Sequence, residues 1–83
     1  MERSEVRNKI IEWMRSEFKR LKDHDFKDEE LLREELGLDS LDLIELVVAA
    51  EEMFKIEIID SEDLPDVKTF GQMVDKAVEL GAK

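Results

Sequence analysis

Apolar residues recur with a helical period in three separate segments of this chain, which limits its possible folds more than any other feature. The first stripe consists of Val6, Ile10, Met14, Phe18 and Leu21. Steps of four, four, four and three place these residues on one face of a helix. We expect this helix to run from about Glu5 to Lys22, with Ser4 as its cap and Trp13 packing at the edge of the stripe.

The second periodic segment predicts a helix from about Ser40 to Phe54. Its core stripe consists of Leu43, Leu46, Val47, Ala50 and Phe54. The opposite, solvated face carries the acidic residues Asp42, Glu45 and Glu52. A further apolar line, formed by Leu41, Ile44 and Val48, lies beside this acidic face rather than in the centre of the core stripe. Since a small domain has a limited interior, we expect Leu41 and Val48 to be at least partly exposed.

The third periodic segment has clear signals at both ends. Thr69 with Gln72 three residues later forms a capping box, and Gly81 is a natural stop. The apolar face consists of Phe70, Met73, Val74, Ala77 and Leu80. Gly71 weakens this helix by about 1 kcal/mol relative to alanine, and it would permit close packing of another helix.

The segments between these helices are less regular. Residues 22–28 are polar and predict a loop, whereas residues 28–36 predict one or two helical turns. Residues 55–59 predict an extended connection, and residues 60–64 a short helix that ends before Pro65. The fold class is therefore all-α: a single domain over residues 1–83, a small four-helix bundle with three main helices and one short helix.

Charge and composition exclude several classes of function. The chain has 23 acidic and 13 basic side chains, a net charge of −10. Nucleic-acid backbones and anionic membranes are therefore unfavourable partners, whereas proteins with basic patches are favourable ones. Cysteine is absent, which excludes disulfides and thiolate chemistry. Without a membrane-spanning apolar run or a secretory signal, we expect a cytoplasmic protein.

Neither a catalytic nor a metal site is indicated by the sequence, so we do not expect an enzyme. Asp23, Asp25 and Glu34 occupy positions 1, 3 and 12 of a notional calcium loop. Position 6 is Asp28, however, where the calcium loop requires glycine. His24, the only histidine, has no neighbouring residue that would make a catalytic pair, and we expect it to be exposed in a loop.

The junction before the second helix contains the strongest functional signal. Gly37 can adopt the positive φ of a tight turn, and Asp39 and Ser40 are residue types that cap helices. A phosphate attached to Ser40 would be favoured by the positive end of the helix dipole. On local chemistry alone, an ordinary helix cap is the simpler interpretation of Ser40.

The motif Leu36-Gly37-Leu38-Asp39-Ser40-Leu41-Asp42 resembles the signature of acyl carrier proteins around their modified serine. The resemblance continues through Glu45-Leu46-Val47 and Glu51-Glu52-Met53-Phe54, and then through Ile56-Glu57-Ile58. It covers about half of the chain well, although the family often has proline where this chain has Ile59. It implies that a phosphopantetheinyl transferase (holo-ACP synthase) attaches a 4′-phosphopantetheine arm from coenzyme A to Ser40, with Asp39 as its motif neighbour that helps to position the transferase.

The resemblance also implies a docking surface and an acyl pocket. The docking positions are Leu41, Asp42, Glu45, Val48, Glu51, Glu52 and Glu57. The pocket positions are Leu36, Leu43, Leu46, Val47, Ile58 and Val74; plain core packing is the alternative role for the pocket residues. The implied partners are acyl-chain synthases and transferases with basic patches, met by a monomeric carrier.

Three functional interpretations remain open at this point. The first is an acyl carrier for fatty acid or related lipid biosynthesis, with acyl intermediates held as thioesters on the arm. The second is a carrier dedicated to a specialised pathway that assembles polyketides, unusual lipids or aminoacyl groups. The third, from another class, is an unmodified acidic helical protein-interaction module in which Ser40 only caps the helix.

Overall fold

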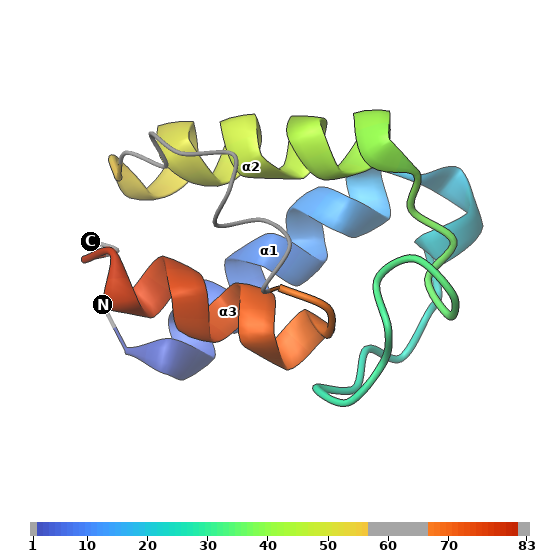
Figure 1. Cartoon of the computed structure of the whole chain (residues 1–83), viewed down its shortest axis with the longest axis horizontal. Helices are drawn as coiled ribbons and strands as arrows, with labels where there is room; N and C mark the ends of the chain where they lie inside the picture. Colours follow the sequence, from blue (N-terminus) through green and yellow to red (C-terminus); the bar gives the residue numbers. More distant parts are fainter. Residues whose placement is uncertain (1, 57–66, 82–83) are drawn as a thin grey trace.

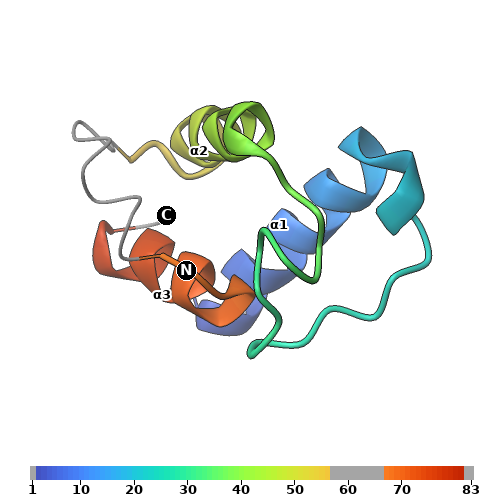
Figure 2. The same cartoon turned by 45° about the vertical axis from the view of Figure 1, so that its right-hand side comes forward.

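The computed structural model describes residues 2–56 and 67–81 and confirms an all-α fold. Within these residues lie three α-helices, α1 (Arg3–Glu17), α2 (Ser40–Phe54) and α3 (Phe70–Glu79), and one 3-10 turn, η1 (Lys19–Leu21). Figures 1 and 2 both show α2 on one side of a layer formed by α1 and α3. The short helix expected over residues 60–64 lies outside the described residues.

Helix α1 differs from its prediction at both ends. Ser4 is not its cap, because the helix begins at Arg3 and Glu2 is the N-cap, without a side-chain cap hydrogen bond. The helix ends at Glu17 instead of Lys22, since Phe18 has extended backbone angles and the 3-10 turn follows it. This tighter turn redirects the chain while it keeps Phe18 and Leu21 buried.

The apolar faces of all three helices meet in one core, as their periodicity predicted. Side chains of the loop over residues 22–39 complete this core. The largest fully buried side chains are Phe54, Phe70, Ile10, Met14, Leu32, Leu46, Val6 and Val74. Trp13 packs at the edge of the core, as expected, with its ring 5.7 Å from that of Phe18 in an edge-on arrangement.

The long loop from residue 22 to residue 39 is docked on the first turn of α3. The backbone N–H groups of Phe70 and Gly71 donate to the carbonyls of Glu30 and Asp28, at 2.9 and 2.8 Å. A single antiparallel bridge joins Leu31 to Thr69. The loop therefore accepts hydrogen bonds from N–H groups that a helix start leaves without intrahelical partners.

Two expectations, one about helical turns in this loop and one about close packing at Gly71, differ from the structure. Residues 32–36 form a hydrogen-bonded turn and bend rather than a helix, although Leu32 and Leu36 are both buried. Gly71 does permit a close approach, but its neighbour is Asp28 of the loop and not a second helix. An added Cβ at Gly71 would lie 2.8 Å from the Cβ of Asp28.

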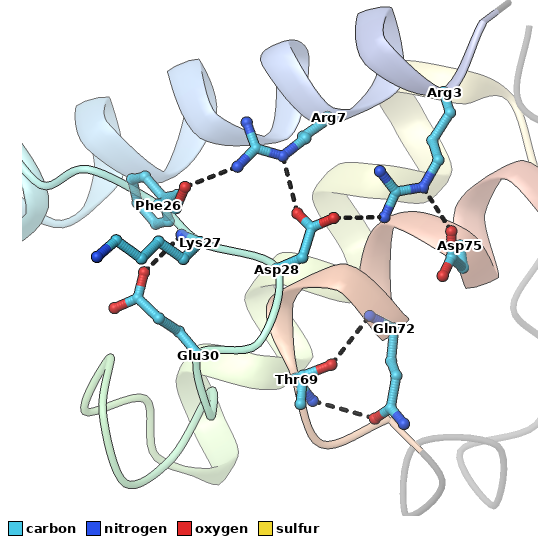
Figure 3. Close-up of polar contacts among 9 residues, drawn as sticks. All are labelled: Arg3, Arg7, Phe26, Lys27, Asp28, Glu30, Thr69, Gln72 and Asp75. Carbon is cyan, nitrogen blue, oxygen red and sulfur yellow. Dashed lines mark hydrogen bonds and ion pairs between the residues drawn. The ribbon is translucent and has the colours of Figure 1, made fainter.

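Asp28 also connects the loop to α1 by two arginines (Figure 3). Its carboxylate accepts hydrogen bonds from Arg7 at 2.9 Å and Arg3 at 3.0 Å, and Arg3 also donates to Asp75 of α3 at 2.6 Å. The hydrogen bond from Arg7 lowers the pKa of the Asp28 carboxyl against an opposing effect of desolvation, and Arg3 lowers it further. Helix α1, the loop and helix α3 thus share one polar network.

The predicted capping box of α3 is confirmed, and the prediction for His24 is wrong. Gln72 N–H donates to Thr69 Oγ1 at 3.1 Å, and Thr69 N–H donates to Gln72 Oε1 at 3.1 Å (Figure 3). His24 is half-buried rather than exposed, with Nε2 2.8 Å from a carboxylate oxygen of Glu30 and its ring edge-on to Phe26. Contacts with Glu30 and Phe26 therefore cover part of the imidazole.

Two negative findings apply to residues 2–56 and 67–81. They contain no group of three or more histidine, cysteine, aspartate or glutamate side chains arranged to hold a metal ion. Within the same residues, every helix is too short or too polar to cross a membrane.

Candidate functional site

The turn that precedes helix α2 is fixed by hydrogen bonds to its backbone and by two buried leucine side chains. Gly37 has a φ of 71°, a left-handed conformation that favours glycine, as predicted. Its carbonyl accepts a hydrogen bond from Arg20 at 2.9 Å. The neighbouring Leu36 and Leu38 are buried, and Leu38 N–H donates to the carbonyl of Leu32 at 3.0 Å. These contacts determine where the next residues lie.

Asp39, and not Ser40, caps helix α2. Its Oδ1 accepts a hydrogen bond from Asp42 N–H at 2.8 Å, and Asp42 Oδ2 accepts one from Asp39 N–H at 3.3 Å. The two aspartates therefore form a reciprocal capping box. The interpretation of Ser40 as an ordinary cap is wrong, because Ser40 is the first residue of the helix and Asp39 already occupies the capping position. The Ser40 hydroxyl is not used to cap the helix.

The Ser40 side chain is exposed at the positive end of α2. Its Oγ accepts a hydrogen bond from Nη2 of Arg33, 3.3 Å away. An accessible hydroxyl, a nearby guanidinium and a helix N-terminus together suit a covalently attached phosphate. The residues present therefore fit a phosphodiester-linked group on Ser40.

The outer face of α2 carries the apolar strip predicted from the sequence. Leu41, Ile44 and Val48 are 63%, 53% and 48% exposed, which confirms the expectation for Leu41 and Val48. Two carboxylates, Glu45 and Glu52, are also exposed on this helix. An exposed apolar strip with nearby carboxylates has the features of a protein-docking surface.

The Asp42 carboxylate is less available to a docking partner than the sequence suggested. It was expected on the solvated face of α2, but its side chain is only 21% exposed. One of its oxygens accepts from Asp39 N–H and also lies 3.6 Å from Arg20 Nη2. Its carboxylate therefore stabilises the helix start. Glu51 is half-buried, and Glu57 lies outside the described residues.

The residues predicted to line an acyl pocket lie in or against the core. Leu36, Leu46, Val47 and Val74 are buried, and Leu43 is half-buried and packs against the core. Ile58 lies outside the described residues. Their positions agree with core packing, and an acyl-binding role for them stays a prediction.

Sequence reasoning did not identify the two arginines at this site. Arg20 follows the first helix, and Arg33 lies seven residues before Ser40 in a run of acidic residues. Neither position belongs to a periodic stripe or to the serine motif. The only available signal was a basic residue within the acidic segment 28–35, and its proximity to Ser40 depends on how the loop folds.

Comparisons with known proteins agree with this geometry. A family profile described as "Phosphopantetheine attachment site" matches residues 8–76. An acyl carrier protein from Wolinella succinogenes is 50% identical over 48 residues, which are 58% of this chain and 62% of that protein. One from Buchnera aphidicola is 45% identical over 53 residues, 61% of this chain and 68% of that protein.

A solved structure supports the fold over almost the whole length. The crystal structure of an acyl carrier protein from Thermotoga maritima aligns with a TM-score of 0.80 and 27% identity. This alignment covers 96% of the present chain and 91% of the other. By sequence, however, the match spans less than two thirds of the length of the Wolinella relative.

Proposed function

Because this chain belongs to the phosphopantetheine attachment site family, we propose that it is an acyl carrier protein whose arm is attached to Ser40. The observation that carries this proposal is that the Ser40 hydroxyl is exposed and does not cap the helix. It is exposed at the first residue of α2, within the family match, and Asp39 relieves it of the capping role. A transferase can therefore reach Oγ without breaking the helix cap.

The chain's own residues present the attachment point to the transferase. The Ser40 oxygen displaces the adenosine-bearing phosphate of coenzyme A, so one phosphoanhydride bond is exchanged for one phosphodiester bond. The hydroxyl proton leaves to a base on the transferase. Asp39 and Asp42 keep the helix start rigid during this exchange, because their mutual hydrogen bonds close the first turn.

When bound, 4′-phosphopantetheine supplies a terminal thiol on which acyl groups are carried as thioesters. The chain has no cysteine of its own, so a carrier role requires such an external thiol. We propose carriage rather than catalysis as the role of the protein. The core residues Leu36, Leu43, Leu46, Val47 and Val74 would shelter the acyl chain when the bundle opens.

The outer face of α2 is proposed to dock partner enzymes. Leu41 and Val48 offer apolar contact area beside Ser40, and Glu45 and Glu52 supply exposed negative charge. Opposite charges on a partner would speed encounter, whereas the apolar contacts would hold the complex. The partners proposed are the phosphopantetheinyl transferase and acyl-chain synthases and transferases with basic patches, in the cytoplasm.

The pathway proposed is fatty acid or related lipid biosynthesis. A carrier for a specialised polyketide, unusual lipid or aminoacyl pathway is the alternative within the same class. The acyl groups found on protein purified from its own cells would separate these alternatives, since the thioester-linked chains can be released and identified by mass spectrometry.

Attachment is tested by intact mass after incubation with coenzyme A and a broad-specificity phosphopantetheinyl transferase. We expect a gain of one phosphopantetheine group in the wild type and none in Ser40→Ala. Ser16→Ala is a matched control, because Ser16 is also an exposed helical serine but lies in α1, outside the motif. It should be loaded like the wild type.

The test also addresses the competing class of function. If the folded wild type gains no mass while a known carrier is loaded in parallel, the carrier proposal fails. An unmodified acidic interaction module would then be the better explanation of the α2 surface. In that case, Ser40→Ala should leave partner affinity almost unchanged.

A further inference from the structure

Arg33 is an arginine whose position relative to Ser40 is not explained by stabilisation of the fold. Arg3, Arg7 and Arg20 each pair with an aspartate, and Arg15 donates to a backbone carbonyl. Within residues 2–56 and 67–81, no carboxylate lies within ion-pair distance of Arg33. In this part of the chain Arg33 donates a hydrogen bond to Ser40 Oγ instead. This choice of partner is unexpected, because a chain with a net charge of −10 has many carboxylates.

The backbone around Arg33 is well anchored, so this position follows from the fold. Arg33 follows Leu32 directly, and both Leu32 and Leu36 are buried. Leu36 N–H donates to the carbonyl of Leu31 at 3.0 Å, and Leu38 N–H donates to that of Leu32 at 3.0 Å. The exposed Arg33 side chain thus extends from an anchored turn toward the first residue of α2.

We propose that Arg33 is a positioning residue that binds the phosphodiester attached to Ser40. This inference rests on the proposed function, because the phosphodiester is the link through which the arm joins Ser40. The non-bridging phosphate oxygens would lie two bonds beyond Oγ, within reach of a guanidinium whose Nη2 is already 3.3 Å from that atom. A guanidinium matches phosphate oxygens with paired, charge-assisted hydrogen bonds.

The charge around the helix start explains why such a cation is useful. Asp39 and Asp42 place two carboxylates in the first turn of α2, close to the attachment atom. A phosphodiester adds one more negative charge there, which these carboxylates would repel. Arg20 is already engaged with Gly37 and Asp42, whereas Arg33 has its guanidinium directed at Ser40.

Binding at this point would restrict the arm where it leaves the protein. The first bonds of the arm would move with the loop and α2, while the distal thiol would remain free to reach partner enzymes. Loss of Arg33 should therefore increase the mobility of the phosphate without removing the attachment.

The test uses loaded protein in four forms: wild type, Arg33→Gln, Arg33→Lys and Lys9→Gln. Lys9→Gln changes the net charge by the same amount as Arg33→Gln, at an exposed position in α1. Intact mass first establishes that each form carries one arm. Phosphorus NMR then measures the chemical shift and line width of the phosphodiester, and nitrogen-edited NMR follows the Arg33 Nε–H signal before and after loading.

We expect loading to shift the Arg33 Nε–H signal of the wild type. The phosphorus resonance should shift and sharpen in Arg33→Gln, change less in Arg33→Lys, and match the wild type in Lys9→Gln. If loaded Arg33→Gln gives the wild-type phosphorus shift and width, the inference is overturned and the carrier proposal stands. If the wild type gains no mass, both are overturned. The wild-type Nε–H shift decides the matter even if Arg33→Gln is not loaded, since an unchanged signal on loading overturns the inference.

Discussion

The contact between Gly71 and Asp28 predicts that a substitution normally favourable in a helix will destabilise this protein. Replacing glycine with alanine inside a helix stabilises it by at most about 1 kcal/mol. In Gly71→Ala, however, the new Cβ would lie 2.8 Å from Asp28 Cβ, 3.0 Å from its carbonyl oxygen and 3.3 Å from its Cα. Ordinary carbon–carbon contacts are about 3.5–4.0 Å, so the loop or the helix must move.

The cost of this movement exceeds the gain in helix propensity. Overpacking of a tight site typically costs about 1–3 kcal/mol. Displacement of Asp28 also weakens the 2.8 Å hydrogen bond from Gly71 N–H, a loss of about 1 kcal/mol that offsets the propensity gain. The partly exposed ion pairs of Asp28 with Arg3 and Arg7 add less than about 1 kcal/mol each. We therefore expect a net loss of about 1–3 kcal/mol.

The assay is reversible unfolding by urea and by heat, followed by far-ultraviolet circular dichroism. For a domain of this length, each kcal/mol corresponds to a change of about 4–8 °C in Tm. The pair Val78→Ala and Val78→Gly, at an exposed position of the same helix, measures the plain difference in propensity between alanine and glycine. There, alanine should be the more stable variant.

An Asp28→Gly background tests whether the steric contact is the cause. It removes the Cβ that lies nearest to the new methyl group, so Gly71→Ala should cost less there than in the wild type. Additivity of the two substitutions would argue against direct contact. A Gly71→Ala protein as stable as the wild type, or more stable, would refute the reasoning entirely.

Three further predictions concern the polar network, the helix cap and the docking surface. The hydrogen bond from Arg7, aided by Arg3, lowers the pKa of Asp28 in the folded protein. The stability that ionised Asp28 contributes should therefore be complete above about pH 4 and be lost as the pH falls through the lowered pKa. In urea titrations, Asp28→Asn should accordingly be less stable than the wild type near neutral pH, with a difference that shrinks in acid; a constant difference would contradict this. Asp39→Ala should cost about 1 kcal/mol in urea unfolding because α2 loses its cap, and Asp39→Asn should recover most of it. Leu41→Ala should change stability by less than about 0.5 kcal/mol, since Leu41 is 63% exposed, yet weaken transferase binding in surface plasmon resonance; unchanged affinity would remove Leu41 from the docking surface.

Local patterns predicted the three main helices, apart from the ends of α1, and the capping box of α3. The stripes of α1, α2 and α3 became buried faces, and Thr69 with Gln72 formed the expected reciprocal hydrogen bonds. Each of these features depends on residues three or four positions apart, which are neighbours in any helix. The exposed strip containing Leu41 was also predictable, because two apolar lines on one helix exceed what a small core can bury.

Errors arose where local rules permitted more than one outcome. Asp39 and Ser40 are both good capping residues, and their side chains alone do not decide between them. Helix α1 could have continued beyond Glu17 on its apolar pattern, yet the 3-10 turn also buries Leu21. The packing of the whole chain selects between such alternatives.

The sequence by itself determined the helical segments, their buried faces and the identity of Ser40 as the candidate attachment residue. Only the tertiary structure decided what surrounds that serine and how the long loop is held. Arg33 meets Ser40 and Asp28 meets Gly71 because residues 22–39 take one particular path over the helices. Such contacts join residues that are distant along the chain or separated by an irregular turn, and no periodic spacing encodes them. They follow from the free energy of packing the whole core.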